Sequence, residues 1–412
     1  MRFLKKVFYN LICVLIRSFS FLIPKDENLW IFGAWNGETY TDNPKILFEY
    51  CRKYHPGKRY VWVTQNDDVV SELSAEGADV VKARTLKWLY CILRASVLFV
   101  SAGGGDIGGI LPGRCTAIQL WHGYGGKVWK KKASKRFFRD SNVHRLLYGD
   151  RNSFYWMAPS EYSVETVHGN HGVNYDRCYI TGQPRDDILK TPDENGILQM
   201  LREKHPDCRN IIAYMPTHRN FGQQQPDYIS DHEFNMINEF CARRDLLFLF
   251  KPHFHELKYY SGIGNHYSHI EIADIDCQPK FQDLYSYLGG VDLLVCDYSS
   301  LIFDFVYMDK PVVLFPYDLE KYNEKNGVPE DYFADPCGPI CYNWNEVLQA
   351  IEAICSDDVW AEARERKKKL THFYDDDQNC ERIYGKATEL RKGWSYQWPK
   401  KVQTKQAEAE KH

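Results

Sequence analysis

The sequence has no Cys-x-x-Cys pair, although it contains 13 cysteines. The closest two, Cys337 and Cys341, have no second pair near them, so a zinc site is not expected. An odd number of scattered cysteines also argues against the disulfide framework of a secreted protein. These absences favour a reducing cytosolic compartment.

The chain also lacks a large excess of charge of either sign. Lysine and arginine total 52, and aspartate and glutamate total 55, which gives a formal net charge of -3. This balance argues against binding of nucleic acid through overall positive charge, and we expect no nucleic-acid partner. The 412 residues, 44% of them hydrophobic, can form a sizeable core and favour two domains over one.

A long uninterrupted apolar run is missing as well. Residues 1–24 combine basic side chains with an apolar stretch from Val7 to Ile23 that polar residues interrupt. A membrane-spanning helix needs about 20 apolar residues, and no cleavage site of a signal peptide follows. The pattern predicts an amphipathic helix that lies in the plane of the membrane, with its basic residues toward anionic lipid. The same residues also fit an ordinary first helix of a soluble domain.

From residue 28 onward, short apolar runs alternate with helical segments, which is typical of parallel sheets in α/β proteins. The expected strands are 29–32, 60–63, 97–100, 117–120 and 156–158, and then 210–215, 246–250, 292–296 and 312–315. Helical spacing follows at 344–355, 357–372 and 378–392, and the last of these helices is expected to pack back onto the first domain. The predicted parts are a membrane-associating helix (1–24), two Rossmann-like domains facing a cleft (25–190 and 191–375), and a helix with a charged tail (376–412).

The strongest local signal lies where a buried strand ends at Asp297. Ser299 and Ser300 follow, and an apolar helix begins at once. Backbone N–H groups at a helix N-terminus, together with hydroxyl donors, favour a bound phosphate. Serine capping explains the same residues without a ligand, so both interpretations stay open.

Two other predicted strands end in basic residues. Lys251 and His253 lie two residues apart, so both side chains leave the strand on the same side, at the sheet edge where α/β domains bind ligands. Together they could clamp a pyrophosphate and polarise its bridging oxygen. Arg219 follows another strand and offers a bidentate fork for phosphate oxygens. The His-x-His spacing also resembles a metal site, but no third ligand lies nearby in the sequence, so no metal is expected.

In the first unit, His122 closes a strand and precedes a glycine-punctuated loop. Its pKa near working pH suits a general base toward an acceptor hydroxyl, although a lone histidine is often structural. A basic segment, 127–145, follows and carries eight Lys or Arg residues. It suits anionic lipid, a lipid-linked pyrophosphate or a polyphosphate chain, unless it is a solvated helix. The residues predicted to form this patch are Lys127, Lys130, Lys131, Lys132, Lys135, Arg136 and Arg139.

A match to the dinucleotide-binding pattern G-x-G-x-x-G occurs at residues 103–108. Pro112 and Gly113 stand where the following helix should run, so the structural context that the motif requires is missing. The segment is predicted to be a loop.

Taken in order, these segments resemble the CDP-glycerol glycerophosphotransferase family, the primases and polymerases of teichoic acids and related capsules. Each motif is weak alone, but the ordered set is specific and covers residues 28–340. The matching pieces are Tyr40-Thr41-Asp42-Asn43-Pro44, Trp121-His122-Gly123, Pro159-Ser160-Glu161-Tyr162, Gly182-Gln183-Pro184-Arg185-Asp186-Asp187, Pro216-Thr217-His218-Arg219, Lys251 with His253, Asp297-Tyr298-Ser299-Ser300 with Asp304, and Tyr317-Asp318-Leu319-Glu320.

The resemblance implies a GT-B fold, peripheral attachment to the cytoplasmic face of the cell membrane, and a donor site in the C-terminal domain. It implies transfer of a phosphopolyol from CDP-glycerol or CDP-ribitol to a lipid-linked or polymeric acceptor, with release of CMP and no obligatory cofactor. His122 and His253 would be catalytic. The implied donor diphosphate ligands are Thr217, Arg219, Lys251, Ser299 and Ser300, with Asp42, Arg185, Asp297 and Asp304 in support.

The sequence departs from the family pattern at two places. Asn326 stands where an arginine usually precedes the glycine, and Phe254 replaces a proline. The first departure makes the transferred polyol less certain than the CDP group. Two other functions also fit the residues: a GT-B glycosyltransferase that uses a nucleotide sugar, and a non-catalytic membrane scaffold that binds anionic polymer through the basic patch.

Overall fold

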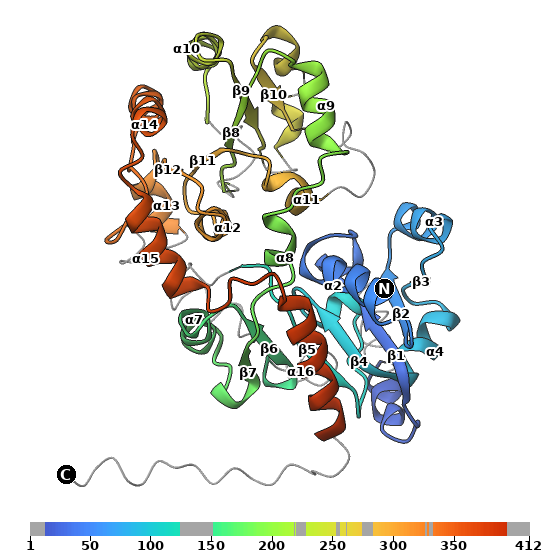
Figure 1. Ribbon diagram of the computed structural model, residues 1–412. Coiled ribbons are helices and arrows are strands. Elements are labelled where there is room, and N and C mark those ends of the chain that lie inside the picture. The colour runs from blue at the N-terminus through green and yellow to red at the C-terminus, as the bar shows by residue number, and fades with distance from the viewer. Residues whose placement is uncertain are drawn as a thin grey trace, which may run out of the picture.

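The computed structural model describes residues 13–123, 151–217, 219, 228–252, 256–260, 262–273, 283–325, 328 and 333–393. Two parallel β-sheets form two lobes, which Figure 1 shows with the first lobe below and the second above. The first sheet has seven strands in the order β3-β2-β1-β4-β5-β6-β7, and the second has five in the order β10-β9-β8-β11-β12. The predicted α/β class, with two parallel sheets, is confirmed.

All nine predicted strands are present, with small differences at their ends. Three strands were missed: β3, β7 and β10. Each has three residues, lies at the edge of a sheet and is not fully buried, unlike the equally short β12, so it lacks the continuous apolar run that marks the other strands. The strands are β1 (Asp26–Phe32), β2 (Arg59–Thr64), β3 (Val80–Lys82), β4 (Ala95–Val100), β5 (Thr116–Gln119), β6 (Tyr155–Ala158), β7 (Cys178–Ile180), β8 (Asn210–Tyr214), β9 (Leu246–Phe250), β10 (Ile270–Ile272), β11 (Leu293–Cys296) and β12 (Val312–Leu314).

Helices cover both faces of each sheet, and residues 13–20 are also helical. The α-helices are α2 (Asp42–Tyr54), α3 (Asp67–Ala75), α4 (Leu86–Arg94), α7 (Glu161–His171), α8 (Asp186–Leu189), α9 (Ile197–Lys204), α10 (Asp231–Ala242), α11 (Leu284–Leu288), α12 (Leu301–Tyr307), α13 (Leu319–Lys325), α14 (Trp344–Ser356), α15 (Ala361–Thr371) and α16 (Asn379–Gly393). The 3-10 turns are η1 (Trp35–Gly37), η2 (Gly104–Ile107), η3 (Arg151–Ser153), η4 (Tyr175–Arg177), η5 (Leu257–Tyr259) and η6 (Ile263–His266).

The strands are apolar along their whole length because both faces of each sheet are buried. In β1, Leu29 and Ile31 pack into one core, while Trp30 and Phe32 pack into the core on the opposite face. Side chains alternate between faces along a strand, so one strand supplies both cores. The second sheet is built in the same way, with cores on both of its faces.

The chain returns to the first lobe at its last helix, as predicted. Cys380, Ile383 and Ala387 of α16 lie in the same core as Trp30, and the rings of Trp30 and Tyr384 are 5.0 Å apart. Figure 1 shows α16 beside β5 and separate from α15, which packs between α12 of the second lobe and α7 of the first. The first lobe is therefore completed by residues from the end of the chain.

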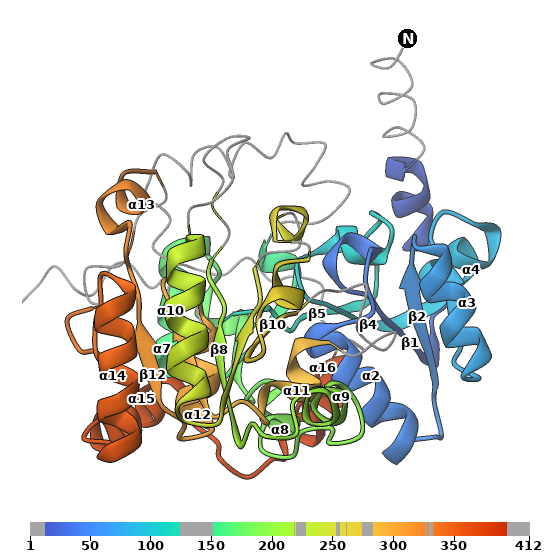
Figure 2. The same cartoon turned by 90° about the horizontal axis from the view of Figure 1, so that it is seen from above.

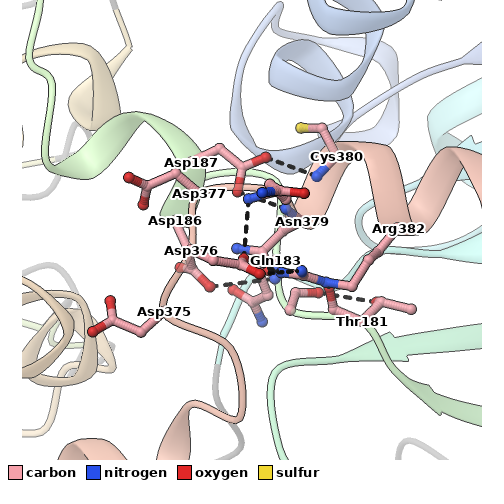
Figure 3. A network of polar contacts seen from close by, with 12 residues as sticks. Thr181, Gln183, Asp186, Asp187, Asp375, Asp376, Asp377, Asn379, Cys380 and Arg382 are labelled. Atoms are coloured by element: carbon pink, nitrogen blue, oxygen red, sulfur yellow. Dashed lines mark hydrogen bonds and ion pairs between the residues drawn. The ribbon is translucent and has the colours of Figure 1, made fainter.

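The two crossings between the lobes are bonded to each other, as Figure 3 shows. The Asp187 carboxylate accepts a hydrogen bond of 2.7 Å from the backbone N–H of Cys380 and so caps α16. Arg382 donates to both carboxylate oxygens of Asp376, at 2.8 Å each, and to the carbonyl oxygen of Thr181 at 3.1 Å. These contacts fix the outgoing and returning segments side by side.

Helical residues 13–20 pack beside α4 at the outer end of the first lobe (Figure 2). Cys13 is buried there, whereas Phe19 and Leu22 are 61% and 77% exposed. Within the part of the chain that the structure describes, no helix is long and apolar enough to cross a membrane.

Candidate functional site

His122 lies directly after β5, at the carboxyl edge of the first sheet. Its Nδ1 atom is 3.1 Å from the carbonyl oxygen of Ser101, and its ring packs against Trp35 and Trp121, with centroids 4.8 and 4.3 Å away. When Nδ1 donates to this carbonyl, the neutral ring carries its lone pair on Nε2. A defined tautomer packed against two indole rings suits the predicted general base.

The Ser101 carbonyl is itself held by a turn organised around Asp106. The Asp106 carboxylate accepts hydrogen bonds from the backbone N–H groups of Ser101, Ala102 and Asn36, at 2.8, 2.7 and 2.7 Å. Burial raises the pKa of Asp106, and these donors oppose the rise. The turn contains η2, and the next element is the strand β5, so the prediction that residues 103–108 form a loop without a Rossmann helix after it is confirmed.

Asp42 reaches His122 through Trp35. The indole Nε1 of Trp35 donates to Asp42 at 3.1 Å. The ring of the same Trp35 packs against the ring of His122. Burial raises the pKa of Asp42 to about 6, although the positive charge of Arg185 opposes the rise. The backbone N–H of Asp42 donates to Asp283 of the second lobe at 3.1 Å. Asp42 therefore lies at the contact between the lobes, and its supporting role stays a prediction.

In the second lobe, Asp297 ties together the ends of two neighbouring strands. It follows β11, and its carboxylate accepts from the backbone N–H of Thr217, which follows β8, at 2.9 Å. It also accepts from its neighbour Tyr298 at 2.6 Å. The turn that leads into Ser299 and Ser300 is thus fixed to the Pro-Thr-His-Arg segment.

Arg219 lies among carboxylates and tyrosines. Its Nη2 is 2.6 Å from Asp297, its Nε is 2.8 Å from Asp318, and the side chain is almost fully buried. The rings of Tyr298 and Tyr322 lie 5.1 and 5.0 Å from the guanidinium carbon. The fork predicted for phosphate therefore holds two carboxylates in this structure, and its direct contact with a donor stays a prediction.

Lys251 and Ser299 lie where the sequence places them, after β9 and before α12. Burial lowers the pKa of Lys251. The Ser299 hydroxyl accepts from the backbone N–H of Leu301 at 3.3 Å, which is a local serine turn just before α12. In the described structure the Ser300 side chain caps no N–H group of α12.

Ser300 instead lies against the His122 loop of the other lobe. A Cβ atom added to Gly123 would stand 3.5 Å from the Ser300 hydroxyl oxygen. The His122 loop, predicted for the acceptor side, and Ser300, predicted for the donor side, are therefore neighbours across the two lobes. Asp304 of α12 and Arg185 of the first lobe also meet here, as an ion pair of 2.8 Å.

A family model described as CDP-Glycerol:Poly(glycerophosphate) glycerophosphotransferase matches residues 15–388. The chain belongs to this family. It is 25% identical over 359 residues to the teichoic acid poly(glycerol phosphate) polymerase of Bacillus subtilis, covering 82% of this chain and 45% of the relative. It is 27% identical over 345 residues to the teichoic acid glycerol-phosphate transferase of Staphylococcus aureus, covering 80% and 84%.

This glycerophosphotransferase family member also resembles solved structures in its fold. The wall teichoic acid polymerase TagF, also solved after a soak with CDPG, is 19% identical in its first structure, with a TM-score of 0.73 over 95% of this chain and 98% of that chain. The MnaA structure with UDP, from Staphylococcus aureus, has a TM-score of 0.56. These likenesses confirm the predicted GT-B-like arrangement. The chain spans about half the length of the Bacillus subtilis polymerase.

Several predicted residues lie outside the part of the chain that the structure describes. They include the second predicted catalytic residue, His253, and both departures from the family pattern, at Phe254 and Asn326. The entire basic patch also lies outside it: Lys127, Lys130, Lys131, Lys132, Lys135, Arg136 and Arg139.

A small, mainly apolar pocket that is open to solvent lies beside the His122 loop and is lined by Trp121, Gly123, Trp156 and Gln183, among others. In the described ranges, no three His, Cys, Asp or Glu side chains are grouped so that they could hold a metal ion.

Sequence reasoning missed several residues that shape this site. Asp106 lay in the rejected glycine motif, and Gln183 and Asp318 lay in motifs quoted for the family without a role. Trp35 and Asp283 gave no signal, because Trp35 packs against His122 and Asp283 accepts from Thr41, and each of these partners is far away in the sequence.

Proposed function

We propose that this chain transfers a phosphoglycerol or another phosphopolyol from a CDP-activated donor to a hydroxyl of a membrane-linked cell-surface polymer, with release of CMP. One observation carries the proposal: the loop of His122 and Gly123 lies against Ser300. A candidate base and a candidate phosphate-binding turn are therefore adjacent where the two lobes meet. The names of the relatives, teichoic acid polymerase and glycerol-phosphate transferase, support the same chemistry.

In the proposed reaction, the acceptor oxygen attacks the β-phosphorus of the CDP-alditol. A new O–P bond forms, the bond from this phosphorus to the CMP oxygen breaks, and the proton of the acceptor hydroxyl passes to Nε2 of His122. Phosphoryl transfers of this kind depend mainly on positioning and on stabilising negative charge. The charge would be stabilised by Lys251, His253 and the hydroxyls of Ser299 and Ser300.

The sequence suggested that Arg219 and Thr217 bind the donor diphosphate directly, but this proposal gives them a different role. Arg219 is held by Asp297 and Asp318, and Thr217 donates its backbone N–H to Asp297. Their contribution is to fix the turn that carries the serines. Contact of the Arg219 guanidinium with phosphate requires exchange of a carboxylate for a phosphate oxygen.

The protein is further proposed to lie at the cytoplasmic face of the cell membrane as a peripheral protein. Phe19 and Leu22 expose apolar surface at the outer end of the first lobe, and in the sequence they follow a basic and apolar N-terminal segment. Exposed aromatic and aliphatic side chains combined with nearby basic residues favour anionic bilayers.

The test is to incubate the protein separately with CDP-glycerol and CDP-ribitol, each labelled at the β-phosphorus, and with membranes from its own host as acceptor. CMP release together with label in the polymer supports the proposal and identifies the polyol. Transfer of a sugar from a nucleotide sugar, without donor phosphorus, would identify a glycosyltransferase instead. Polymer binding with neither reaction would identify a scaffold.

A further inference from the structure

Arg185 and Asp304 form a buried ion pair between the two lobes. Arg185 follows β7 in the first lobe, Asp304 lies in α12 of the second, and the Nε atom is 2.8 Å from Oδ1. Both side chains are 0% exposed. Taking two charges out of water is costly, and apolar residues of similar volume often give equal or better stability. Stability alone therefore does not account for this pair.

The guanidinium of Arg185 also holds the acceptor-side loop. Its Nη1 donates to the carbonyl oxygen of His122 at 3.3 Å, and Gln183, two residues earlier, donates to the carbonyl oxygen of Gly123 at 3.1 Å. The main chain of Arg185 is fixed as well, because its N–H donates to Asn43 at 3.1 Å. The position of the His122 loop is thus tied to the position of Arg185.

On the other side, Asp304 belongs to the helix that begins directly after Ser299 and Ser300. Arg185 donates to the Tyr285 hydroxyl at 2.7 Å, which gives it a second contact with the second lobe. The lobes meet closely here, since Gly123 lies against the Ser300 hydroxyl. One guanidinium therefore joins the loop of the predicted base to the helix of the candidate phosphate turn.

We propose that Arg185 and Asp304 are positioning residues, whose ion pair sets the distance between His122 and the Ser299–Ser300 turn. This inference rests on the proposed function. Neither residue has to touch the donor or the acceptor for this role. Because transfer rates depend steeply on alignment of the reacting groups, loss of the pair should lower kcat more than it weakens donor binding.

The first variant is Asp304→Asn, which removes the charge and keeps the shape. We expect kcat for CMP release to fall at least about 10-fold, while the Kd for CDP-glycerol, measured by calorimetry, changes by less than about threefold. The matched control is Asp358→Asn. Asp358 pairs with Arg364, which is 3% exposed, at 2.6 Å inside the second lobe, with no contact to the His122 loop. This control also removes the charge of a carboxylate paired with a buried arginine, and it should keep kcat within about threefold.

A second variant, Arg185→Lys, tests the pair from the other side. Since both changes break one interaction, the double variant should be no slower than the slower single variant. Additive losses, or an Asp304→Asn protein with kcat within about threefold of wild type, would overturn the proposal.

Hydrogen exchange gives a readout that does not depend on the reaction. Backbone amides of residues 119–123 should exchange at least about 10-fold faster in Asp304→Asn and not in Asp358→Asn. Unchanged exchange in Asp304→Asn would show that the pair does not hold the loop. A wild-type protein that releases no CMP from either donor would instead overturn the proposed function, so the two failures are distinct.

Discussion

The ring of Trp35 lies 4.8 Å from the ring of His122, and the same indole is anchored by a hydrogen bond to the buried Asp42. The orientation of the imidazole is therefore set by packing on one side and by the Ser101 carbonyl on Nδ1. A base that is held in one orientation can accept a proton from a hydroxyl without first reorganising.

We expect His122→Ala to reduce turnover by at least about 10², because the proton of the acceptor hydroxyl loses its acceptor. CMP release in the presence of acceptor membranes measures this loss. The matched control is His168→Ala, since His168 also places Nδ1 against a backbone carbonyl, that of Val173 at 2.8 Å, and stacks on an aromatic ring, Tyr175. Near-wild-type turnover of the His122 variant would remove His122 from the catalytic residues.

His253→Ala is expected to reduce turnover by at least about 10² as well, since the proposal assigns it to the donor diphosphate. The measurement is again CMP release, now over a range of CDP-glycerol concentrations. The exposed His232 of α10 provides a control substitution in the same lobe. Equal turnover of the His253 and His232 variants would contradict the assignment.

Gly33→Ala is expected to destabilise the fold by about 2–4 kcal/mol, because the added methyl group overlaps backbone that cannot move away. A Cβ atom at Gly33 would stand 2.3 Å from the carbonyl oxygen of Asp106, within the turn that holds Ser101. The free energy of unfolding in urea measures the effect. Gly57→Ala is the control, since a Cβ atom there meets nothing within 4 Å.

His171 should make the protein sensitive to acid. Burial lowers the pKa of His171 to about 3, with the nearby positive charge of Arg151 acting in the same direction. In the unfolded chain His171 binds a proton near pH 6.5, whereas in the folded protein it stays neutral to a much lower pH. The contribution of His171 to the free energy of unfolding is therefore fully present above pH 6.5 and is lost as pH falls toward 3. Between pH 7 and 4.5 this group alone should cost about 2–3 kcal/mol.

His171→Gln should therefore reduce the difference in unfolding free energy between pH 7 and pH 4.5. His232→Gln, at an exposed position, should leave this difference unchanged. An equally large pH dependence in His171→Gln and in the wild type would show that His171 is not buried in its neutral form.

The sequence was sufficient for the strands that carry a long apolar run. β4 and β9 are buried at every position, so their composition alone identified them. β7 and β10 have three residues each and are partly exposed at sheet edges, so only their pairing with a neighbour defines them. In the same way, Lys251 and Ser299 were placed correctly because each directly follows an identifiable strand.

The sequence by itself determined the two-sheet α/β class, the strand ends that carry polar residues, and the family, because these depend on composition and local order along the chain. Only the tertiary structure decided that Arg185 pairs with Asp304, that Arg219 is held between Asp297 and Asp318, and that Gly123 lies against Ser300. Each of these contacts joins residues that are about 80 or more positions apart. Such contacts depend on how the lobes and strand ends pack in space, so no local pattern in the sequence predicts them.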